Sequence, residues 1–124
     1  EMIERRAGHV LFISSDVART PRPGMVGYSA TKAGVEAAAR ALGLELEGTG
    51  VLVTTVRVGP TLTDFANTWD AGRLQALMDM WPRFGIQRHF ETMAPAEVAA
   101  AVVFALDAPM HVDLLEVQPE PPLA

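Results

Sequence analysis

Apolar residues follow two different periods along the chain, and these periods predict its elements. Residues 9–14 and 51–58 are mostly apolar runs rich in β-branched and aromatic side chains, typical of strands that a parallel sheet buries on both faces. Residues 112–117 form a third such run. Residues 25–47 contain no proline, repeat apolar side chains at helical spacing and are followed by glycines. The pattern therefore predicts three strands and, after the first of them, a long helix.

Two shorter helices are predicted in the second half of the chain. Residues 70–81 keep helical spacing and stop before Pro82, and residues 96–106 follow Pro95, a residue that is favourable in the first turn of a helix. Residues 16–24 hold a cluster of helix and strand breakers and are predicted to be a loop. Strands that alternate with helices at these lengths predict an α/β fold with a parallel sheet.

The composition excludes several classes of function. Fifteen acidic and ten basic residues give a net charge of −5, the wrong sign for a protein that binds nucleic acid through its phosphates. No apolar run is long enough to span a membrane, and the first residues lack the apolar stretch of a signal peptide, so we expect a cytoplasmic protein without a membrane segment. The chain has no cysteine and its three histidines lack ligand spacing, which predicts no metal site.

The sole tyrosine and the sole lysine stand four residues apart. Tyr28 and Lys32 therefore share one face near the start of the long predicted helix. A neighbouring ammonium stabilises a phenolate and moves the pKa of the phenol toward the range useful for proton transfer. An isolated pair at this spacing is most often a plain surface contact, so the surrounding residues decide its meaning.

Polar residues also follow the first two predicted strands, where each strand ends. Ser15 closes the first strand, and Gly59, Thr61 and Thr63 come directly after the second. Ligands of open parallel sheets bind beyond the carboxyl ends of the strands. A glycine there permits close approach of a ligand, and threonine hydroxyls can bond to it. We therefore expect these residues to meet Tyr28 and Lys32 at one edge of the sheet.

Residues 8–15 and 28–35, read together, resemble the short-chain dehydrogenases/reductases. In that family a strand ending in Ser-Ser precedes Tyr-Ser-Ala-Thr-Lys-Ala on a long helix, as Ser14-Ser15 precedes Tyr28 here. The resemblance covers nearly the whole chain. It implies a Rossmann-like doubly wound parallel sheet, of which residues 1–124 would supply the last three strands, as the C-terminal half of a single domain.

The resemblance also implies roles for the site residues. Tyr28 would be the general acid/base, Ser15 would hold the substrate oxygen, and Lys32 would lower the pKa of Tyr28 and bind the nicotinamide ribose. The substrate would be a small alcohol or carbonyl compound, and the cofactor NAD or NADP. One departure from the family is that Gly59 precedes Pro60, where the family places the proline first. The implied cofactor-binding residues are Tyr28, Lys32, Gly59, Thr61 and Thr63.

Much of the family's nucleotide-binding half has no counterpart in this sequence. No Gly-rich phosphate-binding turn occurs, nor the residue that selects NAD or NADP, so we expect further chain before Glu1 and no activity from this chain alone. The family order would leave the first strand with an unpaired apolar edge. We therefore expect self-association, with residues 25–47 forming a homo-oligomer interface.

Residues 64–92 correspond to the family's variable substrate lid and are rich in large apolar side chains. Two interpretations stay open for them: packing against the domain or a second subunit, and lining of an apolar substrate pocket. The single His89 in this segment is expected to be structural. The apolar residues are Trp69, Leu74, Leu77, Met78, Met80, Trp81, Phe84, Ile86 and Phe90.

The leading interpretation is an oxidoreductase that interconverts an alcohol and a ketone or aldehyde. One alternative is the extended branch of the same family, the nucleotide-sugar epimerases and dehydratases, which the Gly59-Pro60 order favours. The short interval from Ser15 to Tyr28 and the short remainder after Lys32 disfavour that branch. A second alternative is a non-catalytic remnant of such an enzyme.

Overall fold

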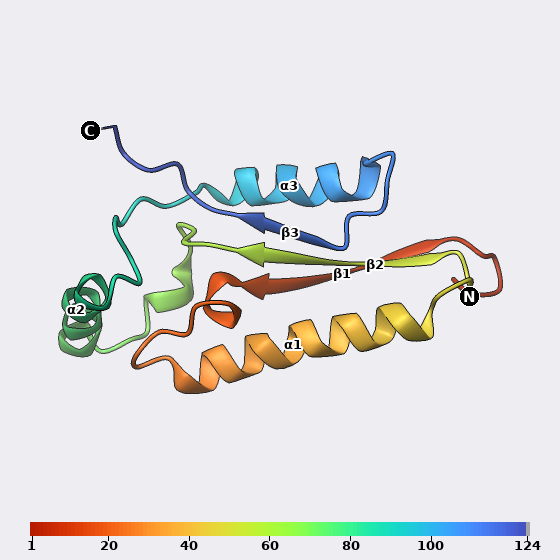
Figure 1. The fold of residues 1–124 in the computed structure, drawn as a ribbon. Helices are drawn as coiled ribbons and strands as arrows, with labels where there is room; N and C mark the ends of the chain where they lie inside the picture. The colour runs from red at the N-terminus through yellow and green to blue at the C-terminus, as the bar shows by residue number, and fades with distance from the viewer. Residues whose placement is uncertain (124) are drawn as a thin grey trace.

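Three parallel strands with helices on both faces make up residues 1–123, which the computed structural model describes. The strand order is β1 (Gly8–Ser15), β2 (Val51–Val58) and β3 (Leu114–Val117), and both pairings are parallel. Helix α1 (Val26–Glu45) lies on one side of the sheet and α3 (Pro95–Asp107) on the other (Figure 1). The predicted α/β fold with a parallel sheet is confirmed.

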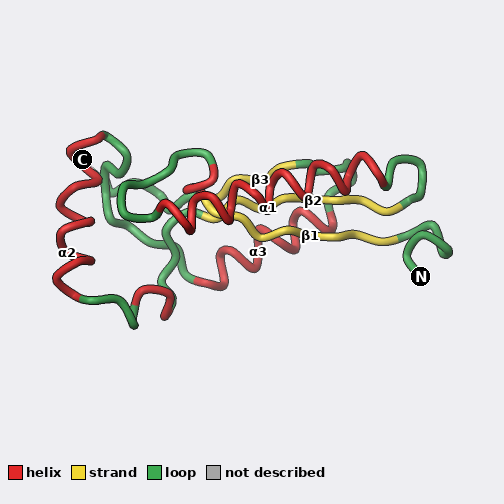
Figure 2. Tube along the Cα trace, turned by 90° about the horizontal axis from the view of Figure 1, so that it is seen from below, coloured by secondary structure: helices red, strands yellow, loops and turns green. Residues whose placement is uncertain are grey.

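The carboxyl ends of the three parallel strands lie at the same end of the molecule. Helix α2 (Ala71–Met80) lies beyond these ends, and the loops that leave β1 and β2 run toward it (Figures 1 and 2). Two short 3₁₀-helices, Asp16–Ala18 and Asp64–Ala66, begin these loops. Across residues 1–123, no helix combines the length and apolarity that crossing a membrane requires.

Most element boundaries differ from the sequence prediction by one or two residues, and β2 matches it at both ends. β1 extends one residue further at each end than residues 9–14, and β3 begins two residues later than 112. Helix α2 ends at Met80, before Pro82 as predicted, and a 3₁₀-helix (Trp81–Phe84) continues directly from it. Proline is tolerated there because the first backbone N–H groups of a helix need no partner within it.

One row of side chains crosses the sheet at the register where Ser14, Arg57 and Glu116 are paired neighbours. Glu36 of α1 lies over this row. Arg57 donates from Nε and Nη2 to the two carboxylate oxygens of Glu36, at 2.9 and 2.7 Å, and from Nη1 to Glu116 at 2.8 Å. Ser14 Oγ donates to Glu36 at 2.8 Å. This cluster ties α1 to all three strands.

The charged groups in this row are shielded from solvent and shift one another's pKa. The side chains of Arg57 and Glu36 are 11% and 8% exposed. The hydrogen bond from Arg57 holds the pKa of Glu36 below its usual range, despite the opposing effect of burial. For Glu116, burial raises the pKa, but the bonds from Arg57 and Gln118 and the charges of Arg19 and Arg57 together outweigh it, and the net shift is downward. Both carboxylates raise the pKa of Arg57.

Apolar surface remains exposed on β1 and α1. Among residues 1–123, β1 pairs only with β2, and Ile13 near its end is 46% exposed. Helix α3 contacts β2 and β3, whereas α1 covers β1 from the other face. Small side chains line the outward face of α1, namely Ala30, Ala33, Ala37 and Ala41, all exposed.

Arg57→Met should destabilise the protein by about 3 to 5 kcal/mol, because it leaves the buried carboxylate of Glu36 without the two hydrogen bonds from Arg57, whereas Glu116 is less buried and keeps its ion pair with Arg19 at 2.8 Å. The stabilisation from Arg57 is present above pH 4.5, the ordinary glutamate pKa, and is lost as the pH falls through the lowered values of Glu36 and Glu116. Urea unfolding at several pH values should therefore show the two proteins converging in acid. Arg40→Ala is the control, since Arg40 is 66% exposed and 3.9 Å from Glu36. Equal losses in both variants would contradict the prediction.

The purified chain should sediment as oligomers, because β1 has a free apolar edge. Ile13→Lys should shift it toward smaller species by placing a charge beside that edge, whereas Thr68→Lys adds the same charge on an exposed loop and should not. Sedimentation velocity measures the distribution. A strictly monomeric chain before any substitution would count against the prediction.

Candidate active site

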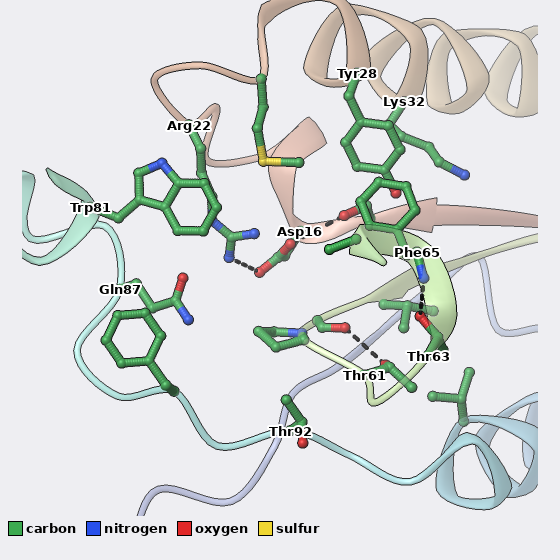
Figure 3. A pocket seen from close by; sticks show the side chains of 18 of the residues that line it. Asp16, Arg22, Tyr28, Lys32, Thr61, Thr63, Phe65, Trp81, Gln87 and Thr92 are labelled. Carbon is green, nitrogen blue, oxygen red and sulfur yellow. Dashed lines mark hydrogen bonds and ion pairs between the residues drawn. The ribbon is translucent and has the colours of Figure 1, made fainter. Parts of the chain in front are cut away.

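A pocket of about 580 Å³ opens at the carboxyl ends of β1 and β2. Its walls come from those strand ends, the first turns of α1 and the segment from Thr61 to Val98 that includes α2. Figure 3 shows side chains from these separate elements pointing into the same space. The pocket brings together every site residue that the sequence predicted, which are Ser15, Tyr28, Lys32, Gly59, Thr61 and Thr63.

Ser15 is held at the end of β1 by its own local structure. Its hydroxyl accepts from the backbone N–H of Val17 at 3.4 Å and so caps the 3₁₀-helix that follows. The same hydroxyl donates to Asp16 Oδ1 at 3.2 Å, and Ser15 is only 8% exposed. The side chain is therefore fixed at the pocket wall before any ligand arrives.

Tyr28 and Lys32 project into the pocket from consecutive turns of α1. Lys32 Nζ lies 5.8 Å from the centroid of the Tyr28 ring and donates to the carbonyl oxygen of Ile13 at 2.9 Å. The Tyr28 ring packs against Phe65, with centroids 5.0 Å apart, and Phe65 packs against Trp69 at 5.4 Å. The ammonium is thus held at the end of β1, beside a phenol that an aromatic stack keeps in place.

The residues after β2 have structural partners of their own. A Cβ on Gly59 would meet the end of the Gln118 side chain and come close to the Val117 carbonyl oxygen, so the chain after β3 passes close to this position. Thr61 Oγ1 donates to the carbonyl oxygen of Gly59 at 3.0 Å. Thr63 Oγ1 accepts from the N–H of Phe65 at 3.3 Å and caps the second 3₁₀-helix. These hydroxyls line the pocket while they also shape the loop.

Sequence reasoning missed a charged pair on the opposite wall. Asp16 and Arg22 form an ion pair at 2.6 Å with side chains 10% and 12% exposed. The Arg22 guanidinium lies 5.4 Å from the centroid of the Trp81 ring, and Trp81 Nε1 donates to the carbonyl oxygen of Pro23 at 3.0 Å. The only sequence signal was an acid and a base within a loop next to Ser15, a pattern too common to single out.

The apolar residues of segment 64–92 divide between the two interpretations left open for them. Trp69, Leu74, Met78, Trp81 and Phe90 line the pocket. Leu77 instead packs against the buried cluster that Val17, Met25 and Trp81 form. The segment therefore serves both as pocket wall and as packing against the domain.

Gly24 allows this segment to approach α1. Its φ is 80°, a left-handed conformation that favours glycine, and a Cβ there would overlap the side chain of Leu77. The loop before α1 and helix α2 can meet closely only because this position has no side chain.

The part of the chain from Glu1 to Leu123 contains no group of three or more side chains that could hold a metal ion. His9 and His111 lie with ring centroids 6.5 Å apart, and His9 stands at the start of β1, far along the strand from the pocket. The polar groups that line the pocket are serine and threonine hydroxyls, the Tyr28 phenol, the Lys32 ammonium, the Gln87 carboxamide and the Asp16–Arg22 ion pair.

Comparison with known proteins assigns the family. The family model for short chain dehydrogenases matches residues 1–74, the stretch that holds Ser15, Tyr28 and Lys32. The chain belongs to the short-chain dehydrogenase family. The chain is 38% identical over 121 residues to a glycine betaine reductase of Emericella nidulans, covering 97% of the chain and 9% of that protein. It is 35% identical to the 2,3-dihydro-2,3-dihydroxybenzoate dehydrogenase of Escherichia coli, covering 91% of the chain and 48% of that enzyme.

A solved structure extends the likeness to the fold. The closed form of a serine dehydrogenase complexed with NADP⁺ aligns with a TM-score of 0.75 and 28% identity. The alignment covers 99% of this chain and 50% of that structure. The expected Rossmann-like architecture is confirmed, and the chain spans about half the length of this structure and of the Escherichia coli enzyme.

Gly24→Ala should loosen α2 from the pocket and destabilise the protein by about 1 to 3 kcal/mol, because the new Cβ meets both a strained φ and Leu77. The two tryptophans of the chain both line the pocket, so their emission should shift to longer wavelength. Gly34→Ala is the matched control, since a Cβ at that helical position meets nothing. Unchanged emission in Gly24→Ala would contradict this account of α2.

Proposed function

We propose that this chain carries the catalytic half of an NAD- or NADP-dependent oxidoreductase that interconverts an alcohol and a ketone or aldehyde. The observation that supports it is the meeting of Ser15, Tyr28 and Lys32 in one pocket at the carboxyl edge of the sheet. A hydroxyl, a phenol and an ammonium are the groups needed to hold a substrate oxygen and exchange a proton with it.

The proton follows a short path in this proposal. In the oxidative direction Tyr28 Oη takes the proton of the substrate hydroxyl, and in the reductive direction it returns a proton to the carbonyl oxygen. Ser15 Oγ donates a hydrogen bond to that oxygen in place of its bond to Asp16. The Lys32 ammonium, 5.8 Å from the Tyr28 ring centroid, stabilises negative charge on the phenolate.

The residues present fit a nicotinamide cofactor. When bound, the nicotinamide supplies the hydride to a carbonyl carbon or accepts it from an alcohol. Lys32 uses one donor on the Ile13 carbonyl oxygen and has two more N–H groups for ribose hydroxyls. The hydroxyls of Thr61 and Thr63 line the same pocket, on the side where Figure 3 shows Lys32.

Such an enzyme would also need the other half of the domain, a second subunit and a substrate that matches the pocket. We infer that residues 1–124 are the C-terminal half of one domain, and that a nucleotide-binding half completes it, since the chain spans about half of its relatives. The exposed alanines of α1 would let a second subunit approach closely and form a homo-oligomer. The substrate is a small molecule with a largely apolar body, matching the lining of the pocket.

Tyr28→Phe should lower turnover by roughly 10² to 10⁴, because the ring stays and the transferable proton is lost. Cofactor affinity should barely change in this variant, whereas Lys32→Ala should weaken both turnover and cofactor binding. The assay follows NADH or NADPH absorbance in the whole protein that carries this sequence.

Thr31→Val is the control for these variants, since Thr31 lies on the exposed side of α1 and donates only to the Gly27 carbonyl oxygen. Its turnover should match that of the unmodified protein. Full turnover in Tyr28→Phe would remove Tyr28 from the mechanism.

A further inference from the structure

The end of β1 is bonded to α1 at the helical turn that begins with Lys32. Lys32 Nζ donates to the Ile13 carbonyl oxygen at 2.9 Å. One turn further along α1, the carboxylate of Glu36 accepts from Ser14 Oγ at 2.8 Å. Ser15 is the next residue of β1, so these two bonds fix its position relative to the face of α1 that lines the pocket.

Arg57 of β2 fixes the orientation of Glu36. Its two bonds to the carboxylate oxygens, at 2.9 and 2.7 Å, are parallel and allow one orientation of the carboxylate. Within residues 1–123, neither Arg57 nor Glu36 lines the pocket. Any effect of this pair on a reaction in the pocket must therefore pass through Ser14, through Lys32 or through its charge.

The opposite charges of Arg57 and Glu36 cancel each other close to the groups that would handle the proton. Glu36 follows Lys32 by four residues and Tyr28 by eight on one face of α1, which places it about 12 Å along the helix axis from Tyr28. At an effective dielectric constant of about 20, an unbalanced charge at that distance moves the pH of half-ionisation of a group by about one unit. The proton exchange at Tyr28 is therefore sensitive to this balance.

The other charged groups of the elements packed around this pair are accounted for. Arg40 of α1 lies 3.9 Å from Glu36 and is 66% exposed, so solvent screens most of its charge. Glu116 of β3 accepts from Arg57 and is also paired with Arg19, at 2.8 Å for each bond. Removing Glu36 or Arg57 alone therefore changes the local charge by one unit, whereas removing both leaves it unchanged.

The charges nearer to Tyr28 stay the same in such variants. Lys32 lies 5.8 Å from the centroid of the Tyr28 ring. Asp16 and Arg22 line the same pocket and balance each other in an ion pair. Asp64, in the 3₁₀-helix after β2, is exposed to solvent.

We propose that Arg57 is a positioning residue for the reaction at Tyr28, acting through Glu36. It holds Glu36 in the orientation that bonds to Ser14, and it cancels the charge of Glu36 one turn from Lys32. The inference rests on the proposed function, and it adds a pair of residues outside the pocket to those on which turnover depends.

The test follows kcat for alcohol oxidation against pH in the whole protein that carries this sequence. Tyr28 must be deprotonated to take the proton of the alcohol, so kcat should rise with pH. Glu36→Gln adds one net positive charge, which favours the phenolate, and the midpoint of this rise should move down by about 0.5 to 1 pH unit. Arg57→Met adds one net negative charge and should move the midpoint up by a similar amount.

The double variant Glu36→Gln with Arg57→Met should restore the midpoint, because the two charges are removed together. It leaves no buried charge without a partner, so it tests the proposal even where Arg57→Met alone fails to fold. Arg57→Lys keeps the charge and cannot form both parallel bonds, so its midpoint should stay while kcat falls about tenfold. Arg40→Met is the matched control, since it removes an exposed charge from the same helix and should leave the midpoint in place.

A second measurement is independent of turnover. The phenolate absorbance of Tyr28 is titrated as the difference between each variant and the same variant with Tyr28→Phe, and its midpoints should shift in the same two directions. Midpoints that stay fixed in Glu36→Gln, shifts of equal sign in both single variants, or a double variant that keeps a shift would overturn the proposal. Full turnover in Tyr28→Phe, with opposite shifts of the absorbance, would refute the proposed function and leave the charge coupling to Tyr28 standing.

Discussion

The bidentate bond between Arg57 and Glu36 sets the position of everything in the pocket that lies on α1. Glu36 follows Lys32 by four residues and Tyr28 by eight, so the three share one face of the helix. An apolar contact would tolerate several rotations of α1 about its axis, whereas two parallel hydrogen bonds at 2.7 and 2.9 Å define one. The register that places Arg57 between Ser14 and Glu116 extends this constraint to β1 and β3. The orientation of the Tyr28 ring thus depends on the Arg57–Glu36 bond, which lies eight residues further along α1.

The sequence was sufficient for the architecture and for one wall of the pocket. Strand and helix periods are local properties, and the spacing of Ser15, Tyr28 and Lys32 depends on elements whose lengths those periods determine. The same reasoning placed Gly59 at the pocket, where a Cβ would also meet the end of the Gln118 side chain. A contact with a side chain almost sixty residues away leaves no trace in the local pattern.

The wall that holds Arg22 and Trp81 could not be predicted, because the segments that form it show neither helical nor strand periodicity. Arg22 stands in a loop and Trp81 in a 3₁₀ turn after α2, and their contact depends on how two irregular segments approach each other. Gly24 permits that approach through its left-handed backbone, yet in the sequence it is one more breaker in a cluster of breakers. Charged pairs in such loops are common, so only the fold distinguishes a buried one from a solvated one.

The two walls differ in how they are attached to the rest of the molecule. Tyr28 and Lys32 belong to a helix bound to the sheet by ion pairs, whereas residues 64–92 contact that scaffold through a few packing and hydrogen-bond contacts such as those of Leu77 and Trp81. Apart from Phe65 and Trp69, which form the aromatic stack beside Tyr28, residues of the segment can therefore be substituted without disturbing Tyr28 and Lys32. Over evolutionary time, such a division lets duplicated genes diverge in what they accept while inheriting an unaltered chemical step.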